Sequence, residues 1–170
     1  LGSQAFAERP SLPLRDLAAV LNLDVMNLYG RTRDVAALGT DQSSLGRTFT
    51  TAAAAEGLRV TVDSGALIRG AFFRSDHFPF ARAGVPALSL EGGSDFTDRP
   101  PGWAEAQRKE YTDSRYHQPQ DELLPWFSMD GALQQLRVIL RVAIAVANTA
   151  APPAWNPGSE FRAAGEARRR

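Results

Sequence analysis

The residues of this chain best suited to chemistry are one aspartate and one histidine that lie 93 positions apart (117 − 24). His117, one of only two histidines, stands in the segment Tyr116–Glu122, where Pro119 separates it from a following helix. Asp24 interrupts the hydrophobic segment Leu21–Asn27. Because the chain has no cysteine, a bound transition metal would need imidazole and carboxylate ligands, both of which zinc accepts. The two residues therefore indicate a metal site.

Asp24 also has structural interpretations. An ionised aspartate in a hydrophobic strand is costly to bury, so it needs a hydrogen bond, an arginine partner or a cation. Open α/β sheets bind ligands beyond the carboxyl ends of their strands, where Asp24 is expected to lie. Taken alone, Asp24 is compatible with each of these three roles.

A second polar group, Ser75-Asp76-His77, precedes a short apolar stretch that ends at Gly84. Ser75 or Asp76 can cap a helix over residues 77–83. We expect His77 to be packed or hydrogen-bonded rather than a metal ligand.

The composition excludes several classes of protein. With 170 residues and 44% hydrophobic content, the chain can bury one core. Lys plus Arg equals Asp plus Glu at 19 each, so no net charge attracts nucleic acid or an anionic membrane. The longest apolar stretch, Val138–Ala150, carries Arg141 and falls short of the roughly 20 residues of a membrane span.

Hydrophobic patterning predicts strands that alternate with helices. This order is typical of a three-layer α/β/α sandwich with a mostly parallel sheet. An antiparallel edge made by the second and third strands stays an alternative. The expected strands are 19–26, 34–38, 59–63 and 85–90, and the expected helices are 43–56, 77–83 and 130–148.

Three details of this pattern matter for the site. The segment 91–118 is expected to be a long loop that walls a binding cleft. Residues 1–150 are expected to form the domain, and residues 151–170 an irregular tail. The inward face of the last helix is expected to consist of Leu133, Leu136, Leu140, Ala143 and Ala147.

Three motifs together resemble those of metallopeptidase family 28. They are Asn22-Leu23-Asp24, then Ser75-Asp76-His77 with Gly84-Val85-Pro86-Ala87, and Tyr116-His117-Gln118-Pro119-Gln120-Asp121-Glu122. The family includes bacterial di-zinc aminopeptidases, glutamate carboxypeptidases and glutaminyl cyclases, and the resemblance runs from about Leu1 to about Phe161. It implies a zinc exopeptidase-like fold, of which residues 1–150 would be the C-terminal part of the catalytic domain.

The resemblance implies roles for individual residues. Asp24 would bind one of two zinc ions, and His117 would bind the other. Ser75 or Asp76 would orient a metal ligand, which is a role that can coexist with helix capping. The implied reaction is aminopeptidase-type hydrolysis, which removes one residue from the end of a peptide substrate.

Apolar residues next to the two predicted ligands are candidates for the wall of a substrate pocket. They are Val25, Met26 and Tyr116, each of which could equally pack in a core. Nothing in the sequence identifies the side chain that such a pocket would select.

The resemblance also implies that part of the machinery is not in this chain. Complete family members carry a His-x-Asp pair and a Glu-Glu pair upstream of the first motif found here. No histidine precedes His77, Glu8 is the only glutamate before Glu56, and no Glu-Glu pair occurs. We therefore expect a fragment without a catalytic base, inactive alone, with an exposed sheet edge and apolar surface.

Two alternatives to the peptidase interpretation stay open. One is a non-catalytic binding or dimerisation domain of the same fold, and the other is a glutaminyl cyclase-like transferase. Relatives of this kind are often exported, so a periplasmic or secreted location is expected.

Overall fold

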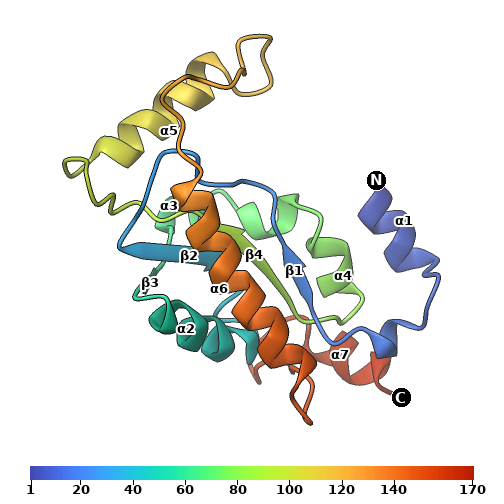
Figure 1. The fold of residues 1–170 in the computed structure, drawn as a ribbon. Coiled ribbons are helices and arrows are strands. Elements are labelled where there is room, and N and C mark those ends of the chain that lie inside the picture. Colours follow the sequence, from blue (N-terminus) through green and yellow to red (C-terminus); the bar gives the residue numbers. More distant parts are fainter.

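The computed structural model describes all 170 residues. Its order of elements alternates between short strands and helices (Figure 1). The strands are β1 (Val20–Asn22), β2 (Asp34–Leu38), β3 (Arg59–Thr61) and β4 (Ala87–Glu91). The helices are α1 (Gly2–Glu8), α2 (Leu45–Ala55), α3 (Ser64–Ile68), α4 (Phe78–Arg82), α5 (Trp103–Ser114), α6 (Asp130–Ala147) and α7 (Arg162–Arg168), with single 3₁₀ turns at Leu14–Asp16 and Ala71–Arg74.

The four strands form one mixed sheet in the order β1-β4-β2-β3. β1 runs parallel to β4 and β2 runs parallel to β3, whereas the central β4–β2 pair is antiparallel. The prediction of a mostly parallel sheet is confirmed, because two of the three pairings are parallel. β2 and β3 are parallel to each other, and both are antiparallel to β1 and β4.

Helices cover both faces of this sheet, which confirms the three-layer α/β/α sandwich. On one face, α2 and α6 pack against the sheet and each other around Phe49, Leu88 and Val138. On the other face, α3, α4 and the C-terminal segment pack around Phe72 and Ala87. The first cluster is purely apolar, whereas the second face also carries the polar side chains described below.

α2 forms where the sequence predicts it. Its buried stripe of Leu45, Phe49, Ala52 and Ala53 is the expected one. The Ser43 hydroxyl accepts a hydrogen bond from the Leu45 amide at 3.3 Å, and the chain turns after the helix at Gly57, whose φ is +71°. A residue with a side chain would be strained in that left-handed conformation.

Two segments expected to be irregular contain helices. The expected loop 91–118 contains α5, which buries none of its residues. The tail 151–170 is not irregular either, because it contains α7, which docks beside Trp155. Trp155 is 8% exposed, and its Nε1 donates a hydrogen bond to the Gly84 carbonyl at 3.0 Å. A Cβ at Gly165 would lie 2.5 Å from the Trp155 ring, so this close approach depends on glycine.

The predicted inward face of α6 is wrong. Leu133, Leu136 and Leu140 are 48%, 43% and 58% exposed. The helix instead turns Val138, Ile139 and Val142 toward the sheet. The helix is apolar on two faces, and helical periodicity alone does not say which of the two packs.

One edge of the sheet and one apolar face of α6 are not covered by other elements. β1 pairs only with β4, so its other edge is free. The exposed leucines of α6 continue into Ile144, which is 53% exposed.

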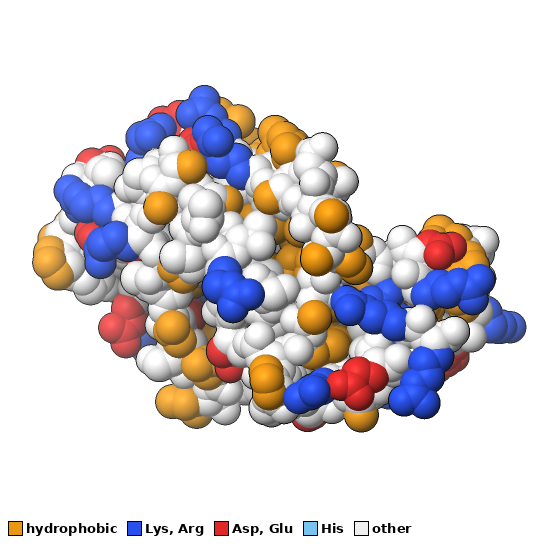
Figure 2. Space-filling model, turned by 90° about the horizontal axis from the view of Figure 1, so that it is seen from below, with side chains coloured by type: hydrophobic (Ala, Val, Ile, Leu, Met, Phe, Trp, Pro, Cys, Tyr) orange, Lys and Arg blue, Asp and Glu red, His pale blue; other side chains and the backbone are white.

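On the face seen in Figure 2, Arg and Lys side chains are scattered among Asp, Glu and hydrophobic ones. No helix of the chain is long and apolar enough to cross a membrane.

Candidate functional site at the strand ends

A chain of hydrogen bonds joins the carboxyl end of β1 and the middle of β4 to the segment before α4. The Asn22 amide donates to the hydroxyls of Ser89 at 3.1 Å and Ser75 at 3.0 Å. Ser75 in turn donates its hydroxyl proton to the Asp24 carboxylate at 3.0 Å. Asp24 is solvent-exposed, so its oxygens lie at the surface while Ser75 restrains their direction.

The polar residues before α4 do not cap that helix. The N-cap position is His77, with no side-chain hydrogen bond to the helix. Asp76 accepts a hydrogen bond from the Ser3 hydroxyl at 2.7 Å, which ties α1 to this segment. Ser75 therefore contacts the predicted metal ligand Asp24, and Asp76 does not.

His77 is a packed residue, as expected. Its side chain is fully buried, and its ring meets the Phe72 ring edge-on with centroids 4.5 Å apart. Neither ring nitrogen makes a hydrogen bond of normal geometry. Burial lowers the pKa of His77 to about 4, against smaller opposing effects of the Phe72 carbonyl, Asp24 and Asp76. The imidazole is therefore neutral near pH 7, and it belongs to no group of three or more side chains that could hold a metal ion.

Glu91 is a candidate functional residue that the sequence did not single out. It is the last residue of β4, two positions beyond Ser89, so it faces the same side as the Asn22–Ser75 network. Burial, together with the negative charges of Asp63 and Asp24, raises the pKa of Glu91 to about 7, while Arg108 and Arg69 oppose the shift. A carboxyl group at the end of a predicted strand was the available signal.

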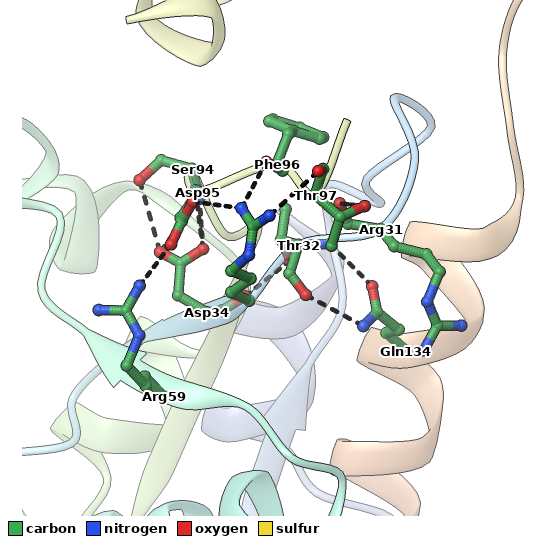
Figure 3. A network of polar contacts seen from close by, with 10 residues as sticks. Arg31, Thr32, Asp34, Arg59, Ser94, Asp95, Phe96, Thr97 and Gln134 are labelled. Atoms are coloured by element: carbon green, nitrogen blue, oxygen red, sulfur yellow. Dashed lines mark hydrogen bonds and ion pairs between the residues drawn. The ribbon is translucent and has the colours of Figure 1, made fainter. Parts of the chain in front are cut away.

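Asp34 is a second carboxylate that the sequence did not identify, and its role is structural. It is 1% exposed and accepts hydrogen bonds from the backbone amides of Ser94 at 3.0 Å and Asp95 at 2.8 Å and from the Thr61 hydroxyl at 2.9 Å. Figure 3 shows this network around the turn that follows β4. A Cβ at Gly93 would lie 2.1 Å from the Asp34 carbonyl oxygen, so only glycine fits.

His117 lies two residues after Arg115, the C-cap of α5. α5, which precedes it, stands apart from the sheet (Figure 1). His117 is exposed, and its ring stacks on Tyr116 with centroids 3.9 Å apart. It is the one non-glycine residue with positive φ, at 58°, a conformation that costs free energy and often marks functional segments.

Aromatic contacts hold the base of the α5 segment. Tyr29 lies at the centre, with ring centroids 5.8 Å from Trp103, 5.7 Å from Trp126 and 5.6 Å from Phe127. Of the predicted pocket wall, Val25 is 62% exposed and Tyr116 is 50% exposed. Their role, together with that of Met26, stays a prediction.

The residues of this chain do not form a complete zinc site. A zinc ion needs three or four protein ligands, and no group of three or more His, Asp or Glu side chains is close enough to hold a metal ion. Asp24 is oriented by Ser75, whereas His117 contacts Tyr116. The metal-binding roles of Asp24 and His117 stay predictions.

The fold and these side chains define an α/β protein with a polar site beside the parallel strands β1 and β4. Residues 1–141 match the family described as Peptidase family M28, and the chain belongs to that family. It is thus related to hydrolases of the metallopeptidase class, and the matched range ends inside α6. No curated protein and no solved structure matches the chain.

Proposed function

We propose that the chain is the part of a zinc-dependent exopeptidase that contributes Asp24 and His117 as metal ligands, in an enzyme that removes residues from the amino end of peptides. One observation carries this proposal. In a member of the M28 family, an exposed carboxylate just beyond the carboxyl end of β1 is held in one direction by Ser75. Such restraint from a neighbouring hydrogen-bond donor is typical of metal ligands.

The proposal includes further protein segments outside residues 1–170. Asp24 and His117 are too few ligands for two ions, and the chain holds no group of three or more side chains that could bind a metal ion. The free edge of β1 and the exposed leucines of α6 lie where another strand and helix would extend the same two layers. An upstream segment of the same protein is the proposed occupant of these surfaces.

The test is complementation. The chain would be expressed alone and together with the segment that precedes it in its coding sequence, and cleavage of leucine p-nitroanilide would be measured with added zinc. We expect turnover from the pair only, and its loss in D24A and H117A, each of which removes a proposed ligand. D98A changes an exposed aspartate away from the site and should keep activity.

Three results would contradict the proposal. Full activity of the D24A and H117A pairs would remove both residues from the metal site. A stable, inactive assembly of the 170-residue chain with itself, with no dependence on the upstream segment, would favour a non-catalytic dimerisation domain. Cyclisation of an N-terminal glutamine peptide without hydrolysis would instead indicate a glutaminyl cyclase-like transferase.

A further inference from the structure

The segment 23–33 joins β1 to β2 and carries both Asp24 and Tyr29. At its centre lies Asn27, which is 6% exposed. The Asn27 side chain accepts a hydrogen bond from the Tyr29 amide at 2.9 Å and donates one to the Gly30 carbonyl at 2.8 Å. These two bonds fold the backbone into a turn. Because Asn27 comes three residues after Asp24 and two before Tyr29, this turn lies between the two.

The first part of α6 forms a seat for the Asn27 turn. Gln135 is 2% exposed, and its Oε1 accepts a hydrogen bond from the Asn27 backbone amide at 2.6 Å. One helical turn earlier, Gly131 allows the helix to approach closely. A Cβ at Gly131 would lie 2.3 Å from both Asn27 Nδ2 and the Gly30 carbonyl oxygen, so only glycine fits there.

Gln134, the neighbour of Gln135, binds the same segment further along. It accepts from the Thr32 amide at 3.0 Å and donates to the Thr32 carbonyl at 3.1 Å (Figure 3). Thr32 is also held from the sheet, because its hydroxyl donates to the Asp34 carbonyl at 2.7 Å. Gln135 is therefore the residue of α6 on which the Asn27 turn depends.

Tyr29 connects this turn to the segment that carries His117. Its ring contacts Trp103 at the start of α5, and Trp126 and Phe127 shortly before α6. His117 lies between these two ends of the segment, and α5 itself buries no residue. The position of Tyr29 therefore affects where His117 lies.

We propose that Gln135 is a positioning residue of the candidate metal site. It holds Asn27, and through the Asn27 turn it sets how the segments that carry Asp24 and His117 lie relative to each other. The inference rests on the proposed function, in which these two residues bind neighbouring ions. Gln135 Nε2 is buried and makes no hydrogen bond, so the side-chain oxygen is the part that acts. A buried amide without an acceptor is costly, so loss of this oxygen should displace the turn.

Distances between spin labels test this inference without a metal or a peptidase assay. The chain has no cysteine, so V25C and Q118C place one nitroxide beside each proposed ligand, at exposed positions. Double electron–electron resonance then measures the distribution of the distance between the labels in the 170-residue chain. The width of this distribution should about double in Q135M, which keeps the length of the side chain and removes the acceptor.

Three further variants separate positioning from stability. Q135E keeps an acceptor oxygen and should retain the original width. I139V removes a methyl group from the core-facing side of the same helix, so it should destabilise the fold without changing the width. N27A keeps the backbone bond to Gln135 but removes the two side-chain bonds of the turn, and it should broaden the distribution as Q135M does. It supplies the answer if circular dichroism shows that Q135M does not fold.

An unchanged width in folded Q135M or in N27A would overturn the inference. Equal broadening in I139V and Q135M would assign the effect to lost stability and overturn it too, as would equal broadening in Q135E and Q135M. An inactive pair in the complementation test changes none of these distances, so the two proposals fail separately.

Discussion

Asp24 and His117, the two predicted metal ligands, lie in regions that are packed to very different extents. Asp24 directly follows a strand of the sheet, and Ser75 holds its carboxylate from one side. His117 follows α5, which buries no residue and is anchored mainly by the aromatic cluster around Tyr29. The contacts within this chain therefore fix the direction of the Asp24 carboxylate, whereas few packing contacts fix the position of His117.

The largest expected difference between the two regions is in stability. Leu88 is fully buried in β4 beside the Asp24 network, and L88A should lower the free energy of unfolding by about 3 kcal/mol. A106G on exposed α5 should destabilise that helix by about 1 kcal/mol. It should leave the free energy of global unfolding nearly unchanged, because α5 can unfold without the core. Urea unfolding followed by circular dichroism measures both. Equal losses would show that α5 is part of the cooperative core.

The second prediction concerns pH and the packed region beside Asp24. The folded-state pKa of His77 is lowered from 6.5 to about 4, so the unfolded chain binds more protons between these values. The free energy of unfolding should therefore fall by roughly 2–3 kcal/mol as the pH drops from 6.5 to 4.

H77F provides the matched variant, because it keeps an aromatic ring against Phe72 and removes the titrating group. Its free energy of unfolding should lose this part of the pH dependence, as measured by urea titrations at several pH values. The same acid-dependent loss in H77F and wild type would assign the effect to other residues.

The third prediction concerns a variant that should loosen the α5 region. Y29A removes the ring at the centre of the aromatic cluster and should cost about 1–2 kcal/mol. Tryptic cleavage after Arg108 and Lys109 should become several times faster, which mass spectrometry of timed digests would show. Y116A, which lies outside that cluster, is the control. If Y29A left the cleavage rate unchanged, the cluster would not be the anchor of α5.

The smallest expected effect is at the Asp24 carboxylate itself. S75A removes the hydroxyl that donates to Asp24 and accepts from Asn22, and should cost about 1 kcal/mol. Chemical denaturation measures this loss, with S94A as the comparison, whose hydroxyl contact to Asp34 is a long 3.4 Å. In the complemented enzyme, S75A should reduce zinc affinity about 10-fold to 100-fold.

Much of the fold could be predicted from the sequence where patterns are local. β2 was predicted at its exact bounds, and α2 was predicted with the correct buried stripe, because its apolar residues share one face only. α6 has two apolar faces, so its orientation depended on tertiary contacts that periodicity does not encode. The α7 segment was missed because its docking depends on the distant contact between Trp155 and Gly84.

The candidate site was predictable to a smaller extent. The resemblance of the Ser75 motif predicts that Ser75 or Asp76 orients a metal ligand, and Ser75 does contact Asp24, 51 positions earlier in the chain. Glu91 was not identified, because its raised pKa results from burial and from neighbouring carboxylates that only the fold brings close. The polar cavity lined by Asp63, Arg69 and Arg108 likewise depends on the position of α5, in a segment that the sequence pattern predicts to be a loop.

Zinc binding by the 170-residue chain tests the central claim most directly. Isothermal titration calorimetry at neutral pH should detect no stoichiometric binding tighter than micromolar, and D24A should give the same result, because the chain holds no group of three ligands. One tightly bound zinc per chain, lost in D24A and accompanied by peptidase turnover, would contradict the account.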